Sequence, residues 1–539
     1  MTAAPVDVAQ GGDLAAPRPP ASVPLDHWAY PLLERLVARD LLEIDLSTRP
    51  VSRADIADAL AGLDVRAFED RWSERERWAL DRLRSEFELG AVDVPAVSMK
   101  RGEASLGLGL SIGVQGVYGG EREVSDLWPG ELPDGALRTA AGAASAEPRV
   151  TVSDEDELDP AVVVAYELWG GVGDRFGFEA ESRVILREQD GPRQVRLSSR
   201  ARTWRGVAAL AERAYVLWES EHLSVAAGRR GPAWGRARWG RLLISGRAPT
   251  FDQVDARYSV GPLSFHALHA VVEREPESDD PGDEDIYLGA HRIALSGDAG
   301  SVAVSELVVY SSTVPDPVYL NPLVPYYLMQ HNERGDDNIL WGLDYDWRVT
   351  PGLELYGEFV VDDLQYDRDT GHPDKYGVTI GSAWYTAVGD MDARLTAEYT
   401  NVRKWTYTHG VTEHRLEHDG MPVGFELGPD ADRVALEARV HPSVAWTAAL
   451  LYERSRKGEG TLSEPFEEDE NDSPSFPSGV VETTDRVALE LAYDHLDGIV
   501  FAGGAAYLSV SNAGNVEGED DDDLELWAGV RFRIGRSDR

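Results

Sequence analysis

Apolar side chains recur at every second position through most of this 539-residue chain. Residues 339–349 read ILWGLDYDWRV, so one face of an extended strand there is apolar and the other carries mainly charge and glycine. Residues 353–362, 434–440 and 487–494 repeat the pattern. A period of two indicates β-strands with one apolar face. From about residue 103 onward we count roughly eighteen such segments, each near the ~9–11 residues that a membrane-crossing strand needs.

The connections between these segments alternate between long and short. The long ones are residues 119–159, 189–206, 230–251, 275–285, 311–338, 363–375, 405–432, 455–484 and 511–524. The tight turns between them are residues 170–174, 219–221, 260–263, 296–300, 349–352, 388–391, 441–443 and 496–498. This alternation is typical of bacterial outer-membrane barrels, whose closure leaves no unpaired sheet edge in lipid. We predict an all-β transmembrane barrel of about 18 antiparallel strands. A soluble all-β array such as a propeller is the alternative.

The amino-acid composition excludes several classes of function and of binding site. The chain carries 95 acidic and 52 basic residues, a formal charge of −43, and so acidic a surface repels nucleic-acid phosphates. It has no cysteine, which excludes disulfides, thiolate zinc sites and cysteine nucleophiles. No apolar run reaches the ~18 residues of a transmembrane helix. Residues 1–20 show no export signal, so the chain is either cytosolic or has lost its signal, and the barrel pattern favours the second.

The segment before the barrel has helical spacing. We predict a disordered segment over residues 1–22, a small N-terminal α-helical domain over residues 23–92, and the barrel over residues 93–539. Asp26 is the expected cap of the first helix. Ser52 with Asp55, and Ser73 with Glu76, read as capping boxes for the next two.

Four stretches of the barrel half carry a family resemblance. They are residues 222–251 (HLSVAAGRRGPAWGRARWGRLLISGRAPTF), 319–325 (YLNPLVP), 355–365 (LYGEFVVDDLQ), and the pair 397–408 (AEYTNVRKWTYT) and 428–433 (GPDADR). In order and spacing they resemble the capsule-assembly proteins of the Wzi family. The resemblance implies an outer-membrane barrel with a periplasmic helical element. It also implies a lectin, not an enzyme, that holds capsular or other exopolysaccharide at the cell surface among outer-membrane lipids.

Residues 23–60 (VPLDHWAYPLLERLVARDLL…TRPVSRADIADAL) separately resemble one S-layer homology repeat. That resemblance implies contact with peptidoglycan or another cell-wall polymer. The other interpretation of the helical domain is a periplasmic cap or plug of the barrel. A porin or sugar-selective channel with a periplasmic anchor is the alternative to the adhesive function.

One expected outer loop concentrates positive charge on this acidic chain. It contains Arg229, Arg230, Arg236, Arg238, Arg241 and Arg247, together with Trp234 and Trp239. Guanidinium groups bind carboxylates in bidentate geometry, and tryptophan faces suit sugar rings. The candidate polysaccharide contacts are therefore Arg229, Arg230, Trp234, Arg236, Trp239, Arg241, and, from another loop, Trp405 and Tyr407. Alternatively the loop folds into the lumen and its arginines pair with inward carboxylates. The expected lumen charges are Asp344, Asp346, Glu358 and Asp362.

Other polar clusters are weaker signals. Asp362 and Asp363 beside Glu358 could serve glycoside cleavage, but they also fit a polar lumen. A loop holding His409, His414 and His418 could bind a metal or simply be solvated. The acidic runs 279–285, 467–472 and 517–523 lack the spacing of a calcium loop. His266 and His269 should face opposite sides of one strand. We expect no catalysis, no cofactor and no metal.

Overall fold

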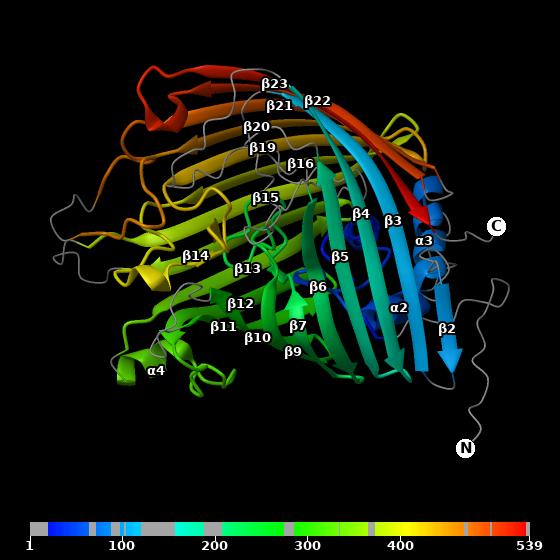
Figure 1. Cartoon of the computed structure of the whole chain (residues 1–539), viewed down its shortest axis with the longest axis horizontal. Helices are drawn as coiled ribbons and strands as arrows, with labels where there is room; N and C mark the ends of the chain where they lie inside the picture. The colour runs from blue at the N-terminus through cyan, green and yellow to red at the C-terminus, as the bar shows by residue number, and fades with distance from the viewer. Residues whose placement is uncertain are drawn as a thin grey trace.

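The polypeptide forms a closed antiparallel β-barrel of eighteen strands with small helices at one end (Figure 1). A computed structural model describes residues 20–63, 72–87, 97–101, 104–119, 157–187, 207–273, 285–333, 335–364, 372–467, 473–495 and 499–534. The predicted fold class is confirmed. None of the described helices is both long and apolar enough to span a bilayer.

Each barrel strand pairs with the next along the chain, and the last pairs with the first. The strands are β3 (Ala104–Gly119), β4 (Glu157–Val172), β5 (Phe176–Arg187), β6 (Val207–Glu219), β7 (Leu223–Arg230), β9 (Phe251–Val260), β10 (Leu263–Glu273), β11 (Asp285–Gly297), β12 (Gly300–Ser312), β13 (Asn338–Thr350), β14 (Leu353–Asp363), β15 (Lys375–Val388), β16 (Met391–Val402), β19 (Ala431–His441), β20 (Trp446–Lys457), β21 (Glu482–His495), β22 (Ile499–Ser511) and β23 (Asp521–Ile534). Register pairs Leu110 of β3 with Ile534 of β23, which closes the ring. The short strand β2 (Val97–Arg101) extends the sheet beside the start of β3.

The two rims of the barrel differ. One rim carries short turns, such as residues 261–262 and 351–352, and we call it the short-turn end. The opposite rim, the long-loop end, carries connections such as residues 231–250, 313–337 and 403–430. The predicted alternation of long and short connections therefore matches the described strands. The long connections predicted between β3 and β4 and between β5 and β6 lie mostly outside the described residues.

The two faces of the wall have opposite character. On β13, Trp341, Leu343 and Tyr345 are exposed on the outside, whereas Asp344 between them is buried inside. The other strands also present exposed leucine, valine and aromatic side chains outward. Because hydrocarbon accepts apolar side chains and rejects charge, this surface suits a lipid exterior and a polar interior. The period of two in the sequence thus correctly assigned the faces of β13.

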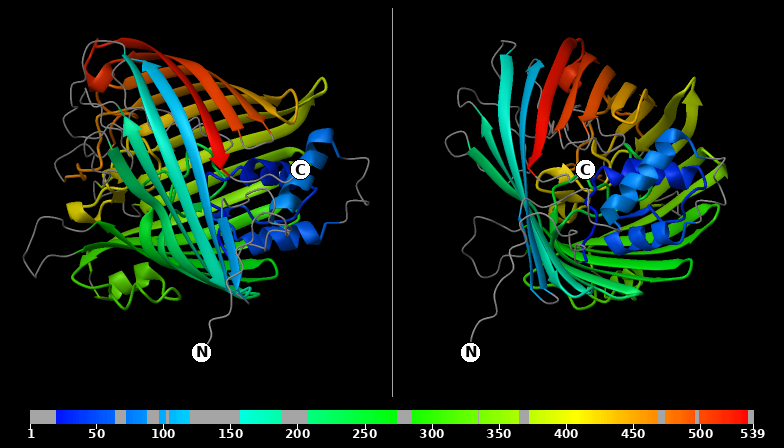
Figure 2. Two further views of the ribbon diagram at one scale, coloured as in Figure 1. Left: turned by 45° about the vertical axis from the view of Figure 1, so that its right-hand side comes forward. Right: turned by 90° about the vertical axis from the view of Figure 1, so that its right-hand side faces the viewer.

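Three helices occupy the opening at the short-turn end, as Figure 2 shows. They are α1 (Ala29–Ala38), α2 (Arg53–Ala61) and α3 (Glu74–Phe87). They share a core with Leu33, Leu36 and Ile56 at its centre. This core gives the helices an apolar interior of their own, separate from the apolar outer wall.

Helix capping follows the sequence in part: Ser73 and Glu76 form the predicted box, whereas Ser52 caps α2 without a hydrogen bond to the side chain of Asp55 among the described residues. The side chain of Ser52 accepts a hydrogen bond from the backbone N–H of Ala54, and Ser73 and Glu76 cap each other's backbone N–H. The prediction for Asp26 was wrong: α1 begins after Trp28, and Asp26 instead pairs with Arg183 of β5 at 3.0 Å. A contact with the barrel wall therefore uses the carboxylate that local sequence assigned to the helix.

Short elements lie within the loops. They are β1 (Thr48–Arg49), β8 (Ala233–Trp234), β17 (Glu417–His418), β18 (Met421–Pro422), α4 (Tyr326–Glu333), η2 (Thr412–His414) and η3 (Ala513–Asn515). Of the segment predicted to be disordered, residues 1–19 lie outside the described residues. Residues 20–22 are described, and the backbone N–H of Ser22 donates to the hydroxyl of Tyr215 at 3.0 Å.

Candidate functional site

The connection from β7 to β9, residues 231–250, folds into the barrel, and we call it the luminal loop. Its side chains Trp234, Trp239 and Leu242 are buried. Wall carboxylates hold its backbone: Glu398 accepts from the N–H of three consecutive residues, 238–240, at 2.7–2.9 Å. Glu358 accepts from two more, Ala237 at 3.1 Å and Leu242 at 2.9 Å. The barrel wall thus supplies the hydrogen-bond acceptors that this irregular backbone needs.

Three of the four arginines of the luminal loop, Arg236, Arg238 and Arg247, form ion pairs inside the protein. Arg236 makes a bidentate contact with Glu354 of β14, with distances of 2.8 and 3.1 Å from Nη2. Arg238 donates from Nη2 to Glu34 of α1 at 2.8 Å. Desolvated guanidinium–carboxylate pairs of this kind require several partners, because each buried charge is costly alone. The interpretation in which this loop lies in the lumen with its arginines paired is therefore the one that the geometry shows.

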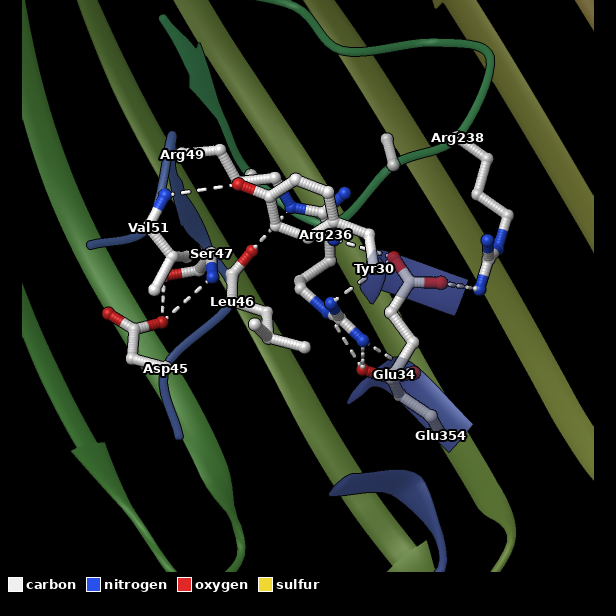
Figure 3. A network of polar contacts seen from close by, with 12 residues as sticks. Tyr30, Glu34, Asp45, Leu46, Ser47, Arg49, Val51, Arg236, Arg238 and Glu354 are labelled. Carbon is white, nitrogen blue, oxygen red and sulfur yellow. Dashed lines mark hydrogen bonds and ion pairs between the residues drawn. The ribbon is translucent and has the colours of Figure 1, made fainter. Parts of the chain in front are cut away.

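Glu34 joins the helices to the luminal loop (Figure 3). Its carboxylate contacts Arg49 at 2.5 Å and Arg238 at 2.8 Å, with Arg236 at 3.7 Å. Burial would by itself raise the pKa of Glu34, but Arg238, Arg49 and Arg236 together hold that pKa well below its ordinary value. The three arginines therefore outweigh burial and keep the Glu34 carboxylate charged at neutral pH.

The backbones of the two plugging segments also touch. The strand β1, beside the helices, pairs antiparallel with β8 of the luminal loop, with Thr48 opposite Trp234. Next to this pairing, Arg292 of β11 donates to the hydroxyls of Thr48 and Ser47 and pairs with Asp344. Two segments that enter from opposite ends of the barrel therefore meet within it.

The helices are fastened to the rim as well. Arg35 of α1 pairs with Asp392 of β16 at 2.8 Å, and Arg82 of α3 pairs with Asp494 of β21 at 2.8 Å. The backbone carbonyl of Ala38 accepts from the N–H of Gly352 in the turn between β13 and β14 at 2.7 Å. The helical domain is thus bound to several sides of the opening.

The other candidate contacts lie on both faces of the wall. Arg230 pairs with Asp255 at 2.8 Å on the inner face. Arg229 pairs with Asp252 at 2.7 Å on the outer face, the face of the exposed Val254. Arg241 donates to the carbonyls of its own loop, and desolvation with the charge of Arg49 lowers its pKa to about 10.

Trp405 and Tyr407 lie buried in the loop 403–430. The hydroxyl of Tyr407 donates to the carbonyl of Leu242 at 2.6 Å, and its N–H donates to Asp362. The residues expected to touch glycan thus mostly hold the plug in place, and their contact with glycan stays a prediction.

The expected lumen charges all have contacts on the inner side. Asp344 pairs with Arg292, Glu358 accepts from the luminal loop, Asp362 accepts from Tyr407, and Asp346 accepts from the hydroxyl of Ser301. Backbone N–H groups therefore occupy the carboxylates of Glu358 and Asp362 that were considered for glycoside cleavage.

The histidines considered for metal binding point to different partners. His414 contacts the hydroxyl of Ser311 at 3.1 Å, whereas His418 contacts the carbonyl of Val272. Within the described part of the chain, no group of three or more His, Asp or Glu side chains is positioned to hold a metal ion. His266 and His269 do face opposite sides, toward Trp234 inside and Tyr310 outside.

A basic and aromatic cluster lies at the long-loop end, and the sequence did not reveal most of it. It consists of Tyr376, Arg403, Lys404, Phe466 and Phe476, all half-buried. Arg403 lies over the ring of Phe476 at 4.6 Å, and Lys404 lies over buried Trp405 at 4.7 Å. Among the described residues, neither cation has a carboxylate in ion-pair contact. We call these five residues the loop cluster.

We compared the sequence and the fold with those of known proteins. No family model and no curated protein sequence matches the chain. Among solved structures, it is similar to Wzi of Escherichia coli, described as an outer-membrane protein involved in group 1 capsule assembly and a carbohydrate-binding β-barrel. The TM-score is 0.62 at 14% identity, over 96% of this chain and 99% of that one. The chain has the Wzi fold.

Porins give weaker matches. OprD of Pseudomonas aeruginosa aligns with a TM-score of 0.40 at 11% identity, over 79% of this chain and 94% of that one. A BenF-like porin from Pseudomonas fluorescens Pf-5 gives 0.44 at 8% identity, over 79% and 98%. The resemblance to Wzi inferred from the sequence is thus confirmed as a likeness of fold. The resemblance of residues 23–60 to an S-layer homology repeat stays a prediction.

Proposed function

We propose that this protein is an outer-membrane barrel that binds capsular or other exopolysaccharide and retains it at the cell surface, as a lectin and not as an enzyme. The long-loop end then faces outward and the helices face the periplasm. The observation that carries the proposal is the occupation of the lumen by the luminal loop and by the helical domain. A barrel filled in this way offers a ligand its long-loop surface instead of a pore.

The loop cluster supplies suitable chemistry for an acidic glycan. Arg403 and Lys404 are cations on a chain of net charge −43, so they are the natural contacts for uronic-acid carboxylates or phosphate groups. Phe466 and Phe476 present apolar rings beside them, against which the apolar face of a sugar can pack. The carbohydrate binding recorded for Wzi, which has the same fold, supports this assignment.

The residues first singled out as glycan contacts act beneath this surface in the proposal. Trp405 supports Lys404, and Tyr407 ties the same loop to the luminal loop. Arg230, Arg236 and their neighbours fix the luminal loop below it. Their role would be to keep the loop cluster rigid, which lowers the entropic cost of binding a flexible polymer.

Polysaccharide binding by the purified protein tests the proposal. The wild type should bind an acidic polysaccharide such as alginate more tightly than neutral dextran. The double variant Arg403→Ala with Lys404→Ala should lose at least about tenfold in affinity, the equivalent of 1.4 kcal/mol. Arg454→Ala is the matched control. This exposed cation lies on β20, the strand that precedes the loop with Phe466 and Phe476, and it faces outward from the barrel. Equal binding by all three proteins would contradict the assignment of the loop cluster.

Conductance in planar bilayers separates this function from the porin alternative. The ion-paired segments inside the barrel predict a nearly silent protein. A steady conductance through the wild type would favour the channel and overturn the lectin.

Cell-wall attachment by the helical domain is a separate proposal. Sedimentation of the purified protein with peptidoglycan sacculi would test it. A protein that stays in the supernatant would leave the domain as a plug only.

A further inference from the structure

The connection from β12 to β13, residues 313–337, folds onto the outside of the barrel, and we call it the external clip. Figure 1 shows its helix α4 outside the ring of strands, beside β11 and β12. Its aromatic side chains Tyr319 and Tyr326 pack against Tyr287 of β11 and Tyr310 of β12. The clip is therefore seated on the wall and does not project away from it.

A carboxylate on the outer face of the wall anchors the clip. Glu306 of β12 lies on the same face as the exposed Val302 and Val304. It accepts hydrogen bonds from the backbone N–H of Tyr326 at 2.8 Å and of Tyr327 at 2.9 Å, in the first turn of α4. The indole of Trp341 donates to it at 3.0 Å. A carboxylate on the lipid-facing side is expensive unless it is capped, and the helix N-terminus does the capping.

The position of this anchor fixes the height of the clip. Glu306 is register-paired with Trp341, and the next outward row toward the short-turn end pairs Val304 with Leu343 and Ile293. That row is exposed and wholly apolar. The clip thus sits at the edge of the apolar belt that is nearer the long-loop end.

The external clip exposes a group of large apolar side chains. Leu323 is 79% exposed, and Leu320, Tyr327 and Leu328 are each about half exposed. Within the soluble part of a protein such a group of leucines would be a liability. Here it continues the apolar belt of the wall, and residues of this kind favour the boundary between headgroups and acyl chains.

We propose that the external clip inserts Leu320, Leu323 and Leu328 into the lipid leaflet at the long-loop end and so sets how deeply the barrel sits. The occupant of this surface is lipid. The inference rests on the proposed placement of the barrel in a membrane. A second copy of the chain is the other candidate occupant, and the experiment below distinguishes the two.

Nitroxide labelling tests the proposal directly, because the chain has no native cysteine. Leu323→Cys and Leu328→Cys, each spin-labelled, are reconstituted in phosphatidylcholine–phosphatidylglycerol vesicles. Relaxation by oxygen, which partitions into lipid, is compared with relaxation by a water-soluble nickel chelate. Both labels should be relaxed more by oxygen. Leu343→Cys in the apolar belt is the lipid control, and Val516→Cys, exposed in the loop between β22 and β23, is the water control.

The outcomes are separable. If the label at 343 behaves as in lipid but the labels at 323 and 328 behave like the one at 516, the clip does not insert and the inference is wrong. If the label at 343 also behaves as in water, the barrel is not in the membrane and the proposed function fails with it. Dipolar broadening between labels at 323 would show a second copy on this surface and would overturn lipid as its occupant. Adding Glu306→Ala should move the label at 328 toward the water response.

Discussion

The luminal loop and the external clip both leave the long-loop end, yet they fold to opposite sides of the same wall. Each is held by the same device, a wall carboxylate that accepts backbone N–H groups. Glu398 accepts from three residues of the luminal loop, and Glu306 accepts from two residues of the clip. The anchoring of an irregular segment on a barrel is thus independent of which side it covers.

The luminal loop and the external clip share the same kind of anchor, but their other side chains differ in character. The luminal loop directs Arg236 and Arg238 at buried carboxylates, because the interior of the barrel is polar and acidic. The clip turns Leu323 and Leu328 outward, beside the apolar belt. The polarity of the surroundings on each side of the wall therefore matches the type of side chain that the segment carries there. On both sides, a wall carboxylate accepts the hydrogen bonds of the segment's backbone N–H groups.

Removing the luminal anchor should have the largest effect. Glu398→Ala leaves three backbone donors and the hydroxyl of Tyr356 without their acceptor, so we expect a loss of roughly 3–5 kcal/mol in the free energy of unfolding. Glu306→Ala on the outer face should cost less, because only two of its partners are fixed backbone donors. The other two are the side chains of Trp341 and His291, which can reorient. Urea unfolding in lipid vesicles, followed by tryptophan fluorescence, measures both. The exposed carboxylate of Glu517 provides a control in Glu517→Ala, and equal losses for all three would refute the comparison.

The ion pairs around Glu34 should show their own pH dependence. The folded pKa of Glu34 is depressed, so its contribution is fully present above its unfolded pKa of about 4.3 and is lost as pH falls through the folded pKa. We expect Glu34→Gln to destabilise the protein by about 2–4 kcal/mol at pH 7. The difference from wild type should stay constant down to pH 5 and shrink only in stronger acid. A difference that halves between pH 7 and pH 5 would contradict the depressed pKa.

The next largest loss of stability is expected from a substitution that disturbs the backbone of the luminal loop. Gly235 has φ of 91°, and a Cβ there would lie 2.1 Å from a carboxylate oxygen of Glu358. Gly235→Ala should therefore cost roughly 1–3 kcal/mol of stability. Gly231→Ala is the matched control, because its nearest neighbour would be a methyl carbon of Thr250 at 3.3 Å and its φ is not positive. Similar unfolding midpoints for the two variants would argue against a tightly fitted luminal loop.

The smallest effect on folding is expected at the tip of the clip. Leu323→Ser removes a side chain that packs little against the protein, so the free energy of unfolding in detergent should change by less than about 0.5 kcal/mol. The same change is expected to shift the protein's depth in vesicles if the clip inserts into lipid. A large loss of stability in detergent would show that this leucine packs against protein and not lipid.

Much of the barrel could be predicted from local patterns. The alternation in residues 339–349 assigned the inner and outer faces of β13, and the lengths of the connections placed the turns between strands. Ser73 and Glu76 identified a helix start, because a capping box forms within four residues. These features depend on neighbours in the chain, which is why they can be recognised without a structure.

The candidate site could not be predicted in the same way, because its residues are far apart in the sequence. Arg403 and Lys404 stood in a stretch already singled out, but Phe466 and Phe476 come from another loop more than sixty positions away. Glu34 and Glu398 gave no local signal of their role, because the partners that reveal it lie on other elements. Asp26 was misassigned for the same reason, since Arg183 is 157 positions away.

The sequence by itself determined that this chain is a barrel with one apolar and one polar face, because a period of two and a tight turn are properties of a few consecutive residues. Only the tertiary structure decided which loops turn inward and which turn outward. Arg238 and its partner Glu34 are separated by 204 positions in the sequence. The backbone N–H of Arg238 and its acceptor Glu398 are separated by 160 positions. Charges of either sign are abundant in this chain, and the closure of the barrel alone selects which of them meet.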